Sequence, residues 1–250
     1  MRISFQHAIS VLTFSAIVNA APLASQAPVY VPEDASARYH PLPSLREQAD
    51  EQQEWLRLRL TRVLPALMAE YDVDMWILSM REYGEDPVFR AIASPTTFAA
   101  RRRSIYVFTR QDDGTLERLA LGGTSQGGMF EAFRSTRPAP TQPTAELVGN
   151  EQWNLLREVV EDRNPGNIVL NIDPVWAFSD GLGAGEAEAL LEALGNEYSA
   201  RVKREPRLAM NYISLRLPEM MPRYRKIEES VHALISEAFS NSVITPGVTT

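Results

Sequence analysis

Four charged side chains follow directly after an apolar run of strand length. Residues 75–78 are Met-Trp-Ile-Leu, and the next charges are Arg81, Glu82, Glu85 and Asp86, all within six residues. A buried strand that opens onto a charged loop is a common way for α/β folds to present functional groups. The alternative is a solvated loop in which Arg81 pairs with Glu85 or Asp86, an interaction worth at most about 1 kcal/mol.

The same loop could also be considered as a metal site. Glu82, Glu85 and Asp86 offer the oxygen ligands that a hard cation prefers, but a proline follows them and their spacing is more typical of an ordinary charged loop. Once a leader is removed, only His40 and His232 remain as imidazole ligands, and no His-Glu-x-x-His motif is present. We therefore predict no metal site within these 250 residues.

A second candidate is a glycine-rich loop. Residues 123–127 match G-x-S-x-G, the nucleophile elbow of serine hydrolases, and they stand between a predicted strand and a possible helix over 129–134. Asp173 or Asp180, followed by His232, would complete the chain order of such a triad.

Three observations weigh against Ser125 as a nucleophile. No His-Gly-Gly stretch supplies an oxyanion hole, His232 falls in the middle of a regular helical pattern, and little chain follows Ser125 to complete such a sheet. A plain glycine loop is the favoured interpretation.

The composition bounds the class of protein. The chain is 44% hydrophobic and 23% charged, with a net charge of −7 and one basic cluster, residues 101–103, so nucleic acid is not a predicted partner. The absence of cysteine excludes disulfides and thiolate chemistry. Residues 1–24 have the pattern of a signal peptide, with an apolar core too short to span a bilayer, and residues 25–44 form a proline-rich linker.

Hydrophobic periodicity predicts an α/β domain with a mixed sheet that includes a hairpin. Prolines 138, 140 and 143 predict a long surface connection, and Ser179 or Asp180 is predicted to cap a helix that Gly195 ends. The predicted helices are 47–71 with a disturbance at Pro65, 151–162, 186–194 and 219–240, and the predicted strands are 75–78, 104–109, 116–121 and 168–172.

Several segments, taken in order, carry a resemblance to a known family: residues 63–68, 74–77, 81–88, 179–182, 224–227 and 244–250. Together they resemble the pita-bread metallopeptidases of the aminopeptidase P, creatinase and prolidase group, in particular exported bacterial Xaa-Pro aminopeptidase-like proteins. The resemblance covers roughly Leu45 to Thr250.

The resemblance implies a ribonuclease-H-like, creatinase N-terminal domain over 45–215 and the first helix of a catalytic domain over 216–250. Such an accessory domain overhangs the active site and assists homodimer formation. Arg81, Glu82 and Asp86 would then bind a peptide substrate, but only beside a complete catalytic domain. That domain holds two divalent metals, manganese, cobalt or zinc, on Asp, Asp, His, Glu and Glu, and none of these ligands has a counterpart here. The alternatives are a non-catalytic binding or dimerisation module and, third, a serine hydrolase.

Overall fold

The computed structural model describes residues 38–100, 102–134 and 151–250. The predicted signal peptide, most of the predicted linker, Arg101 and the predicted proline-rich surface connection lie outside the described residues. Within the described part of the chain, no helix combines the length and the apolar character needed to cross a membrane.

Helices and strands are interspersed along the described residues. Helices and strands follow in the order α1 (Leu45–Leu58), a π-helical turn (Arg59–Val63), α2 (Leu64–Glu70), β1 (Met75–Met80), α3 (Phe89–Ile92), β2 (Ser104–Arg110), β3 (Leu116–Leu121), β4 (Glu131–Phe133), α4 (Glu151–Arg163), β5 (Ile168–Leu170), the 3₁₀ turn η2 (Ala177–Ser179), α5 (Ala184–Ser199), β6 (Val202–Lys203), α6 (Pro206–Ser214), the 3₁₀ turn η3 (Pro218–Met220) and α7 (Met221–Ala238).

Six strands of the described residues form one mixed sheet in the order β4-β3-β2-β1-β5-β6. β2 pairs antiparallel with both β1 and β3, whereas β1 with β5, β5 with β6 and β3 with β4 are parallel pairs. Five strands therefore run in one direction and β2 alone runs in the other. The predicted mixed α/β sheet with a hairpin is confirmed, and the carboxyl ends of the five parallel strands meet at one edge.

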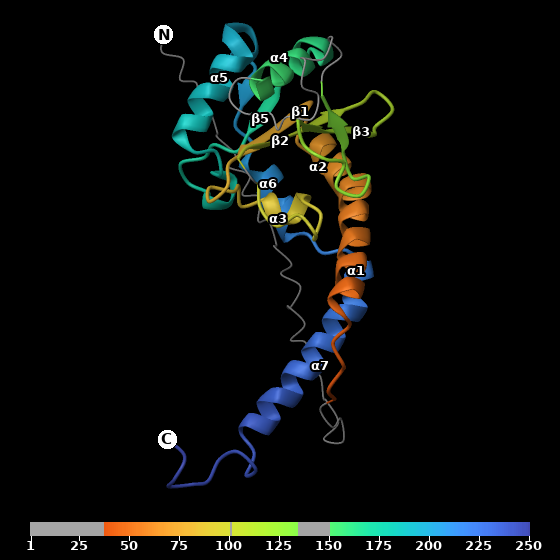
Figure 1. The fold of residues 1–250 in the computed structure, drawn as a ribbon, viewed down its shortest axis with the longest axis vertical. Coiled ribbons are helices and arrows are strands. Elements are labelled where there is room, and N and C mark those ends of the chain that lie inside the picture. Colours follow the sequence, from red (N-terminus) through yellow and green to blue (C-terminus); the bar gives the residue numbers. More distant parts are fainter. Residues whose placement is uncertain (1–37, 101, 135–150) are drawn as a thin grey trace, which may run out of the picture. The chain divides into compact units, whose positions relative to one another are not determined.

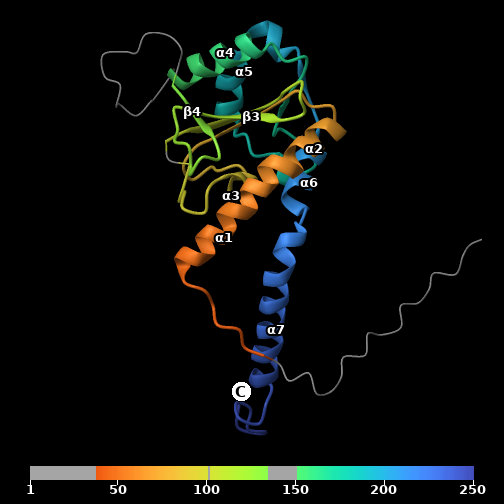
Figure 2. The ribbon, with the colours of Figure 1, turned by 90° about the vertical axis from the view of Figure 1, so that its right-hand side faces the viewer.

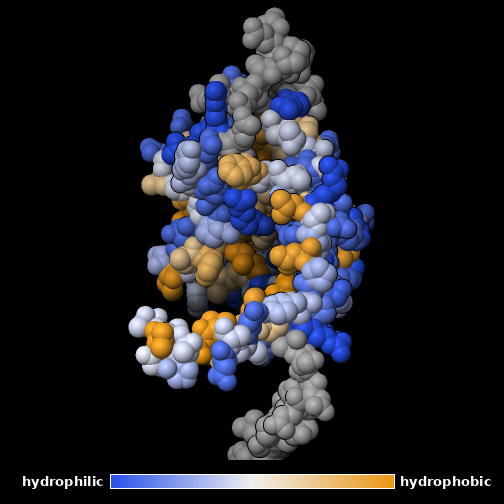
Figure 3. Space-filling model, turned by 60° about the horizontal axis from the view of Figure 1, so that its bottom comes forward, coloured by the Kyte–Doolittle hydropathy of each residue, from blue (hydrophilic) through white to orange (hydrophobic). Residues whose placement is uncertain are grey.

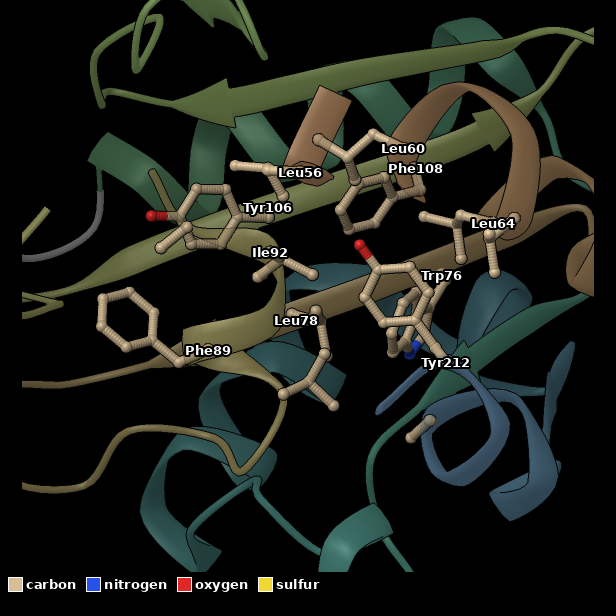
Figure 4. Packing of buried hydrophobic residues seen from close by; sticks show 14 of the residues in the cluster. Leu56, Leu60, Leu64, Trp76, Leu78, Phe89, Ile92, Tyr106, Phe108 and Tyr212 are labelled. Atoms are coloured by element: carbon tan, nitrogen blue, oxygen red, sulfur yellow. The ribbon is translucent and has the colours of Figure 1, made fainter. Parts of the chain in front are cut away.

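Helices cover both faces of this sheet (Figures 1 and 2). Because side chains alternate along β1, Trp76 and Leu78 face the helices α1, α2, α3 and α6, while Met75 and Ile77 face α4 and α5. Figure 4 shows the first of these cores, in which Trp76 packs against Phe108 and Tyr212 at ring distances of 5.5 and 6.0 Å. Every residue of β1 is buried, as the apolar run predicts.

The predicted disturbance at Pro65 is confirmed as a π-helical turn between α1 and α2. Proline has no N–H, so Pro65 cannot donate to the carbonyl four residues earlier. In the turn before it, the Leu64 N–H donates to the carbonyl of Arg59, which is the hydrogen-bond spacing of a π-helix. α1 begins where a capping box is complete, with the Ser44 hydroxyl accepting from the Glu47 N–H and the Glu47 carboxylate accepting from the Ser44 N–H.

The helix predicted over 129–134 is wrong, because this segment forms β4 beside β3. Phe130 packs against Tyr106 and Phe108 on one face of the sheet, whereas Phe133 is buried in the core on the other face. A short strand can place neighbouring side chains in two cores, which a helix lying on one face of the sheet cannot do.

The predicted cap of α5 is also wrong. The Ser179 hydroxyl donates to the carbonyl of Pro206, and the Asp180 carboxylate accepts from the Asp173 N–H, so Gly183 is left as an N-cap without a side chain. Gly195 does leave helical geometry, at φ 66° and ψ 178°, but helical structure resumes and continues to Ser199.

α7 confirms the predicted amphipathic helix, and its apolar face is exposed. Residues 39 and 40 contact the opposite side, where the His40 N–H donates to Ser230 and Ala233 is buried. Figure 3 turns the α7 end of the molecule toward the viewer and shows apolar side chains at its surface. The exposed large apolar residues of α7 are Met221, Tyr224, Ile227, Val231, Leu234 and Ile235.

Candidate functional site

The charged loop predicted from the sequence lies at the edge where the five parallel strands end. It begins with a tight turn that follows β1, in which the Gly84 N–H donates to the carbonyl of Arg81 at 3.0 Å. Tyr83 occupies the left-handed region at φ 65°, a conformation that is unfavourable in free energy for any residue with a side chain. The Tyr83 side chain is 97% exposed. The turn therefore holds an aromatic ring out in solvent beside Arg81.

Arg81 is held by Glu186, a residue of α5 that no motif in the sequence marks. Arg81 Nε lies 3.1 Å from Glu186 Oε1, and the Arg81 side chain is 61% exposed while that of Glu186 is 6% exposed. The alternative prediction, in which Arg81 pairs with Glu85 or Asp86, names a different partner from the one that the structure shows.

Glu186 is also bound by Arg103 and Ser79. Arg103 donates from Nε and an Nη nitrogen to the two carboxylate oxygens at 3.0 Å each, and the Ser79 hydroxyl donates at 3.1 Å. These charge-assisted bonds compensate the desolvation of a buried carboxylate. The only sequence signal for Glu186 is an acidic residue four positions before Leu190, on the buried stripe of a helix.

A cavity of about 300 Å³ opens beside this turn. Two of the three predicted substrate-binding residues, Arg81 and Glu82, line it, and Asp86 does not. The lining residues are Ser79, Met80, Arg81, Glu82, Tyr83, Gly84, Arg102, Gly183 and Glu186.

Asp86 is buried beneath the loop in a network of its own. Its two carboxylate oxygens accept from the Asn171 amide at 3.0 and 2.9 Å, and one of them accepts from the Val88 N–H at 2.8 Å. The Asn171 carbonyl oxygen in turn accepts from Trp76 Nε1 at 3.0 Å. Burial raises the pKa of Asp86 to about 6, although the hydrogen bonds from Val88 and Asn171 oppose the shift. The network ties the loop after β1 to the end of β5.

Asp173 anchors the next loop along the same edge. It accepts from the backbone N–H groups of Val175 and Trp176 and from Arg204 at 2.7 Å. The Arg204 guanidinium and these backbone N–H groups lower the pKa of Asp173. Trp176 and Phe178 in this loop are exposed.

The surroundings of Ser125 in the structure differ from those that a serine nucleophile requires. A strand, β4, follows this loop in place of the helix of a nucleophile elbow. Gln126, at φ 49°, ties the loop down by accepting from the Ser94 N–H and donating to the Tyr106 hydroxyl. Among the described residues, no hydrogen bond joins His232 to Asp173 or Asp180, both of which have partners elsewhere.

Within the described ranges, no group of three or more histidine or acidic side chains is arranged to hold a metal ion. The two divalent metals that the resemblance implies therefore find no ligand set in this part of the chain.

No protein-family model, no curated protein and no solved structure matches the chain. The function is therefore inferred from the fold, from the geometry of the site and from the resemblance of the sequence segments.

Proposed function

We propose that residues 1–250 form the N-terminal portion of an exported, metal-dependent aminopeptidase of the Xaa-Pro type, acting in the periplasm or outside the cell. In this proposal residues 45–215 are a creatinase N-terminal-like domain that covers the active site and assists homodimer formation. Residues 216–250 begin the catalytic domain, whose other residues hold the two divalent metals.

One observation supports this role more than any other. Arg81 reaches an open cavity from the end of a fully buried strand, and a buried carboxylate holds it there. A guanidinium fixed in this way is suited to bind a peptide carboxylate through two parallel hydrogen bonds. The mixed sheet flanked by helices is compatible with the ribonuclease-H-like architecture that the resemblance implies.

The role of each predicted residue follows from its position. Arg81 and Glu82 would contact the peptide, because both line the cavity. Asp86 would act through the loop, because it is buried and bound to Asn171. The proposal therefore assigns Asp86 to positioning the loop.

The test is kinetic and uses a polypeptide in which residues 1–250 are followed by the catalytic domain. We expect Arg81→Ala to lower kcat/KM for an Xaa-Pro dipeptide at least a hundredfold, about 2.7 kcal/mol, with an unchanged melting temperature. Arg204→Ala is the matched control, because Arg204 is also 61% exposed and also pairs with a buried carboxylate. A change within about threefold for Arg81→Ala, about 0.7 kcal/mol, would contradict the role of Arg81.

The coding sequence beyond Thr250 provides an independent test. Ligands in the order Asp, Asp, His, Glu and Glu are expected there, and a stop codon would favour the second candidate, a non-catalytic binding or dimerisation module. The exposed apolar face of α7 is the observation that favours that second candidate.

A further inference from the structure

The loop between β5 and α5 buries polar side chains and exposes apolar ones. Val175, Trp176 and Phe178 are each half exposed or more, whereas Asp173 and Ser179 are buried. The usual arrangement in a folded domain is the reverse, because apolar area in contact with water is unfavourable. Neighbouring apolar side chains that stay exposed mark an interaction site, whereas isolated ones need no explanation.

Hydrogen bonds close this loop at its base. The backbone N–H groups of Gly181 and Leu182 both donate to the carbonyl of Asn171 at 3.1 Å. The Asp180 carboxylate accepts from the Asp173 N–H, also at 3.1 Å. The two ends of the loop are therefore joined, and the residues between them form a projection of fixed length.

The buried polar side chains hold the backbone of the projection with its apolar side outward. One oxygen of Asp173 accepts from the N–H groups of Val175 and Trp176 at 2.8 and 2.9 Å. The Ser179 hydroxyl donates to the carbonyl of Pro206 at 2.7 Å. Turning the loop over to bury Trp176 would break these bonds and leave buried polar groups unpaired. The fold itself therefore imposes the exposure of the apolar side chains.

Arg204 presents a guanidinium beside the apolar side chains. Its side chain is 61% exposed, while that of its partner Asp173 is 1% exposed, so the negative member of the pair lies beneath the surface. The loop and the adjoining residues 203–207 carry equal numbers of acidic and basic side chains: Asp173, Asp180, Lys203, Arg204, Glu205 and Arg207. This region therefore lacks the net negative charge of the whole chain, and a phosphate group can approach Arg204.

The exposed area of the loop distinguishes between two kinds of partner. A fully exposed aromatic side chain presents about 150–250 Å², so the exposed parts of Val175, Trp176 and Phe178 amount to roughly 300–400 Å². A stable protein interface buries about 800 Å² on each partner, about twice that area. A lipid surface has no such minimum, because a few apolar side chains can enter the boundary between headgroups and acyl chains. Tryptophan is enriched at that boundary.

We propose that residues 172–180 dock the protein on a phospholipid surface, with Val175, Trp176 and Phe178 in the boundary region and Arg204 at the headgroup phosphates. The inference goes beyond the proposed function, because it uses neither the Arg81 cavity nor a catalytic domain.

The first test measures whether Trp176 enters the lipid. It uses residues 25–250, the form without the predicted signal peptide, because the apolar core of that peptide would bind lipid itself. Vesicles of phosphatidylcholine brominated in its acyl chains should quench the tryptophan emission. Trp176→Tyr should abolish this quenching, because the other tryptophans, Trp55, Trp76 and Trp153, pack in or against the two cores.

The second test compares variants by cosedimentation with phosphatidylcholine vesicles. Combined Val175→Ser and Phe178→Ser should lower the partition coefficient at least tenfold with an unchanged melting temperature, because both side chains are exposed. Combined Ile227→Ser and Leu234→Ser is the matched control, since these two apolar side chains are exposed on α7. We expect the control to change the partition coefficient less than twofold.

Four results would overturn the proposal. They are no partition at up to about 5 mM lipid, partition that survives the change at Val175 and Phe178, partition that falls instead with the control on α7, and quenching that persists in Trp176→Tyr. Self-association without lipid that the change at Val175 and Phe178 abolishes would also overturn it, by identifying the loop as a protein interface.

Discussion

At the scale of single residues, buried carboxylates decide how the functional loops are held. Glu186 fixes Arg81 and Arg103, Asp173 holds a loop through Arg204, and Asp86 accepts hydrogen bonds from the neutral donors Asn171 and Val88. A buried carboxylate beside a guanidinium keeps its charge, whereas one beside neutral donors resists ionisation. These environments give Asp86 and Asp173 opposite effects on stability as pH changes.

The pH dependence of folding tests the environment of Asp86. Its pKa of about 6 lies above the ordinary value of 3.8, so the folded state binds more protons than the unfolded state between these values. The free energy of unfolding therefore falls as pH rises through this window, and the contribution of this group amounts to about 2–3 kcal/mol. Asp86→Asn should remove that dependence.

The measurement is urea unfolding of both proteins at pH 4 and pH 7. At each pH we compare the free energy of unfolding of Asp86→Asn with that of the wild type. We expect the variant-minus-wild-type difference to be about 2 kcal/mol more positive at pH 7 than at pH 4. The hydrogen bond from Asn171 is stronger to the carboxylate than to the neutral acid, and this difference is already contained in the pKa of about 6. Asp173→Asn is the control with the opposite sign, because the pKa of Asp173 is lowered and its stabilisation is lost as pH falls. Equal relative stability of Asp86→Asn at the two pH values would contradict the expectation.

Two glycines two residues apart provide a second residue-scale prediction. A Cβ on Gly181 would lie 2.1 Å from Asp86 Oδ2 and 2.7 Å from Pro87 Cδ, whereas one on Gly183 would meet nothing within 4 Å. Gly181→Ala should therefore destabilise the protein by about 2 kcal/mol, and Gly183→Ala by less than about 1 kcal/mol. Chemical denaturation measures both, and equal losses would mean that the contact with Asp86 is not what requires glycine.

At the scale of elements, the carboxyl edge of the sheet collects the candidate groups. The loop after β1 carries Arg81, Glu82 and Asp86, and the segment after β5 carries Asn171 and Asp173. β1 and β5 are neighbouring parallel strands, so loops that are far apart in sequence emerge side by side. Positions of this kind are where open α/β sheets bind ligands.

Helix α7 has an apolar face that the rest of the proposed aminopeptidase would cover. In the 250-residue chain we expect Leu234→Gln to change stability by less than about 0.5 kcal/mol, because Leu234 is 55% exposed. In a polypeptide that includes the catalytic domain, the same change should cost about 2 kcal/mol or more, since the side chain would then be buried.

Thermal and urea unfolding of the two polypeptides provide the comparison. Ala233→Gln is the control, because Ala233 is 4% exposed and its replacement should destabilise both forms by about 1–3 kcal/mol through overpacking. A negligible effect of Leu234→Gln in the longer polypeptide would mean that the catalytic domain does not cover this face.

At the scale of the whole molecule, the sheet separates two cores, and the candidate site lies at its edge. One core is built around Trp76, Phe108 and Tyr212, and the other around Ile77, Leu156 and Leu190. Closely packed cores on both faces hold the strand ends rigidly, which a ligand site at the edge requires.

The chain of 250 residues is expected to lack peptidase activity by itself. In the proposed aminopeptidase the metal ligands belong to the catalytic domain, so this chain supplies only substrate contacts. Incubation of the purified chain with manganese and an Xaa-Pro dipeptide should produce no free amino acid above the background with chelator present. Hydrolysis that a chelator abolishes would contradict the division of labour between the two domains.

The amino-acid sequence by itself determined the elements whose signals are local. The buried run at residues 75–78 and the hairpin of the strands predicted over 104–109 and 116–121 each depend on neighbours within a few positions, and both form as predicted. Pro65 disturbs its helix for the same reason, because a missing N–H has its consequence within one turn. The mixed α/β sheet follows from the order of these elements.

Only the tertiary structure decided which of the charged residues meet. Arg81 and Glu186 are far apart in sequence and carry no local sign of contact, and the same holds for Asp86 and Asn171. The resemblance implies Asp86 as a substrate contact together with Arg81 and Glu82, but packing buries Asp86 under the loop while the other two stay at the cavity. Local periodicity predicts which elements form, whereas ion pairs between separate elements depend on how those elements pack. The sequence therefore identified the charged loop after β1 but not the Glu186 carboxylate that holds Arg81 in it.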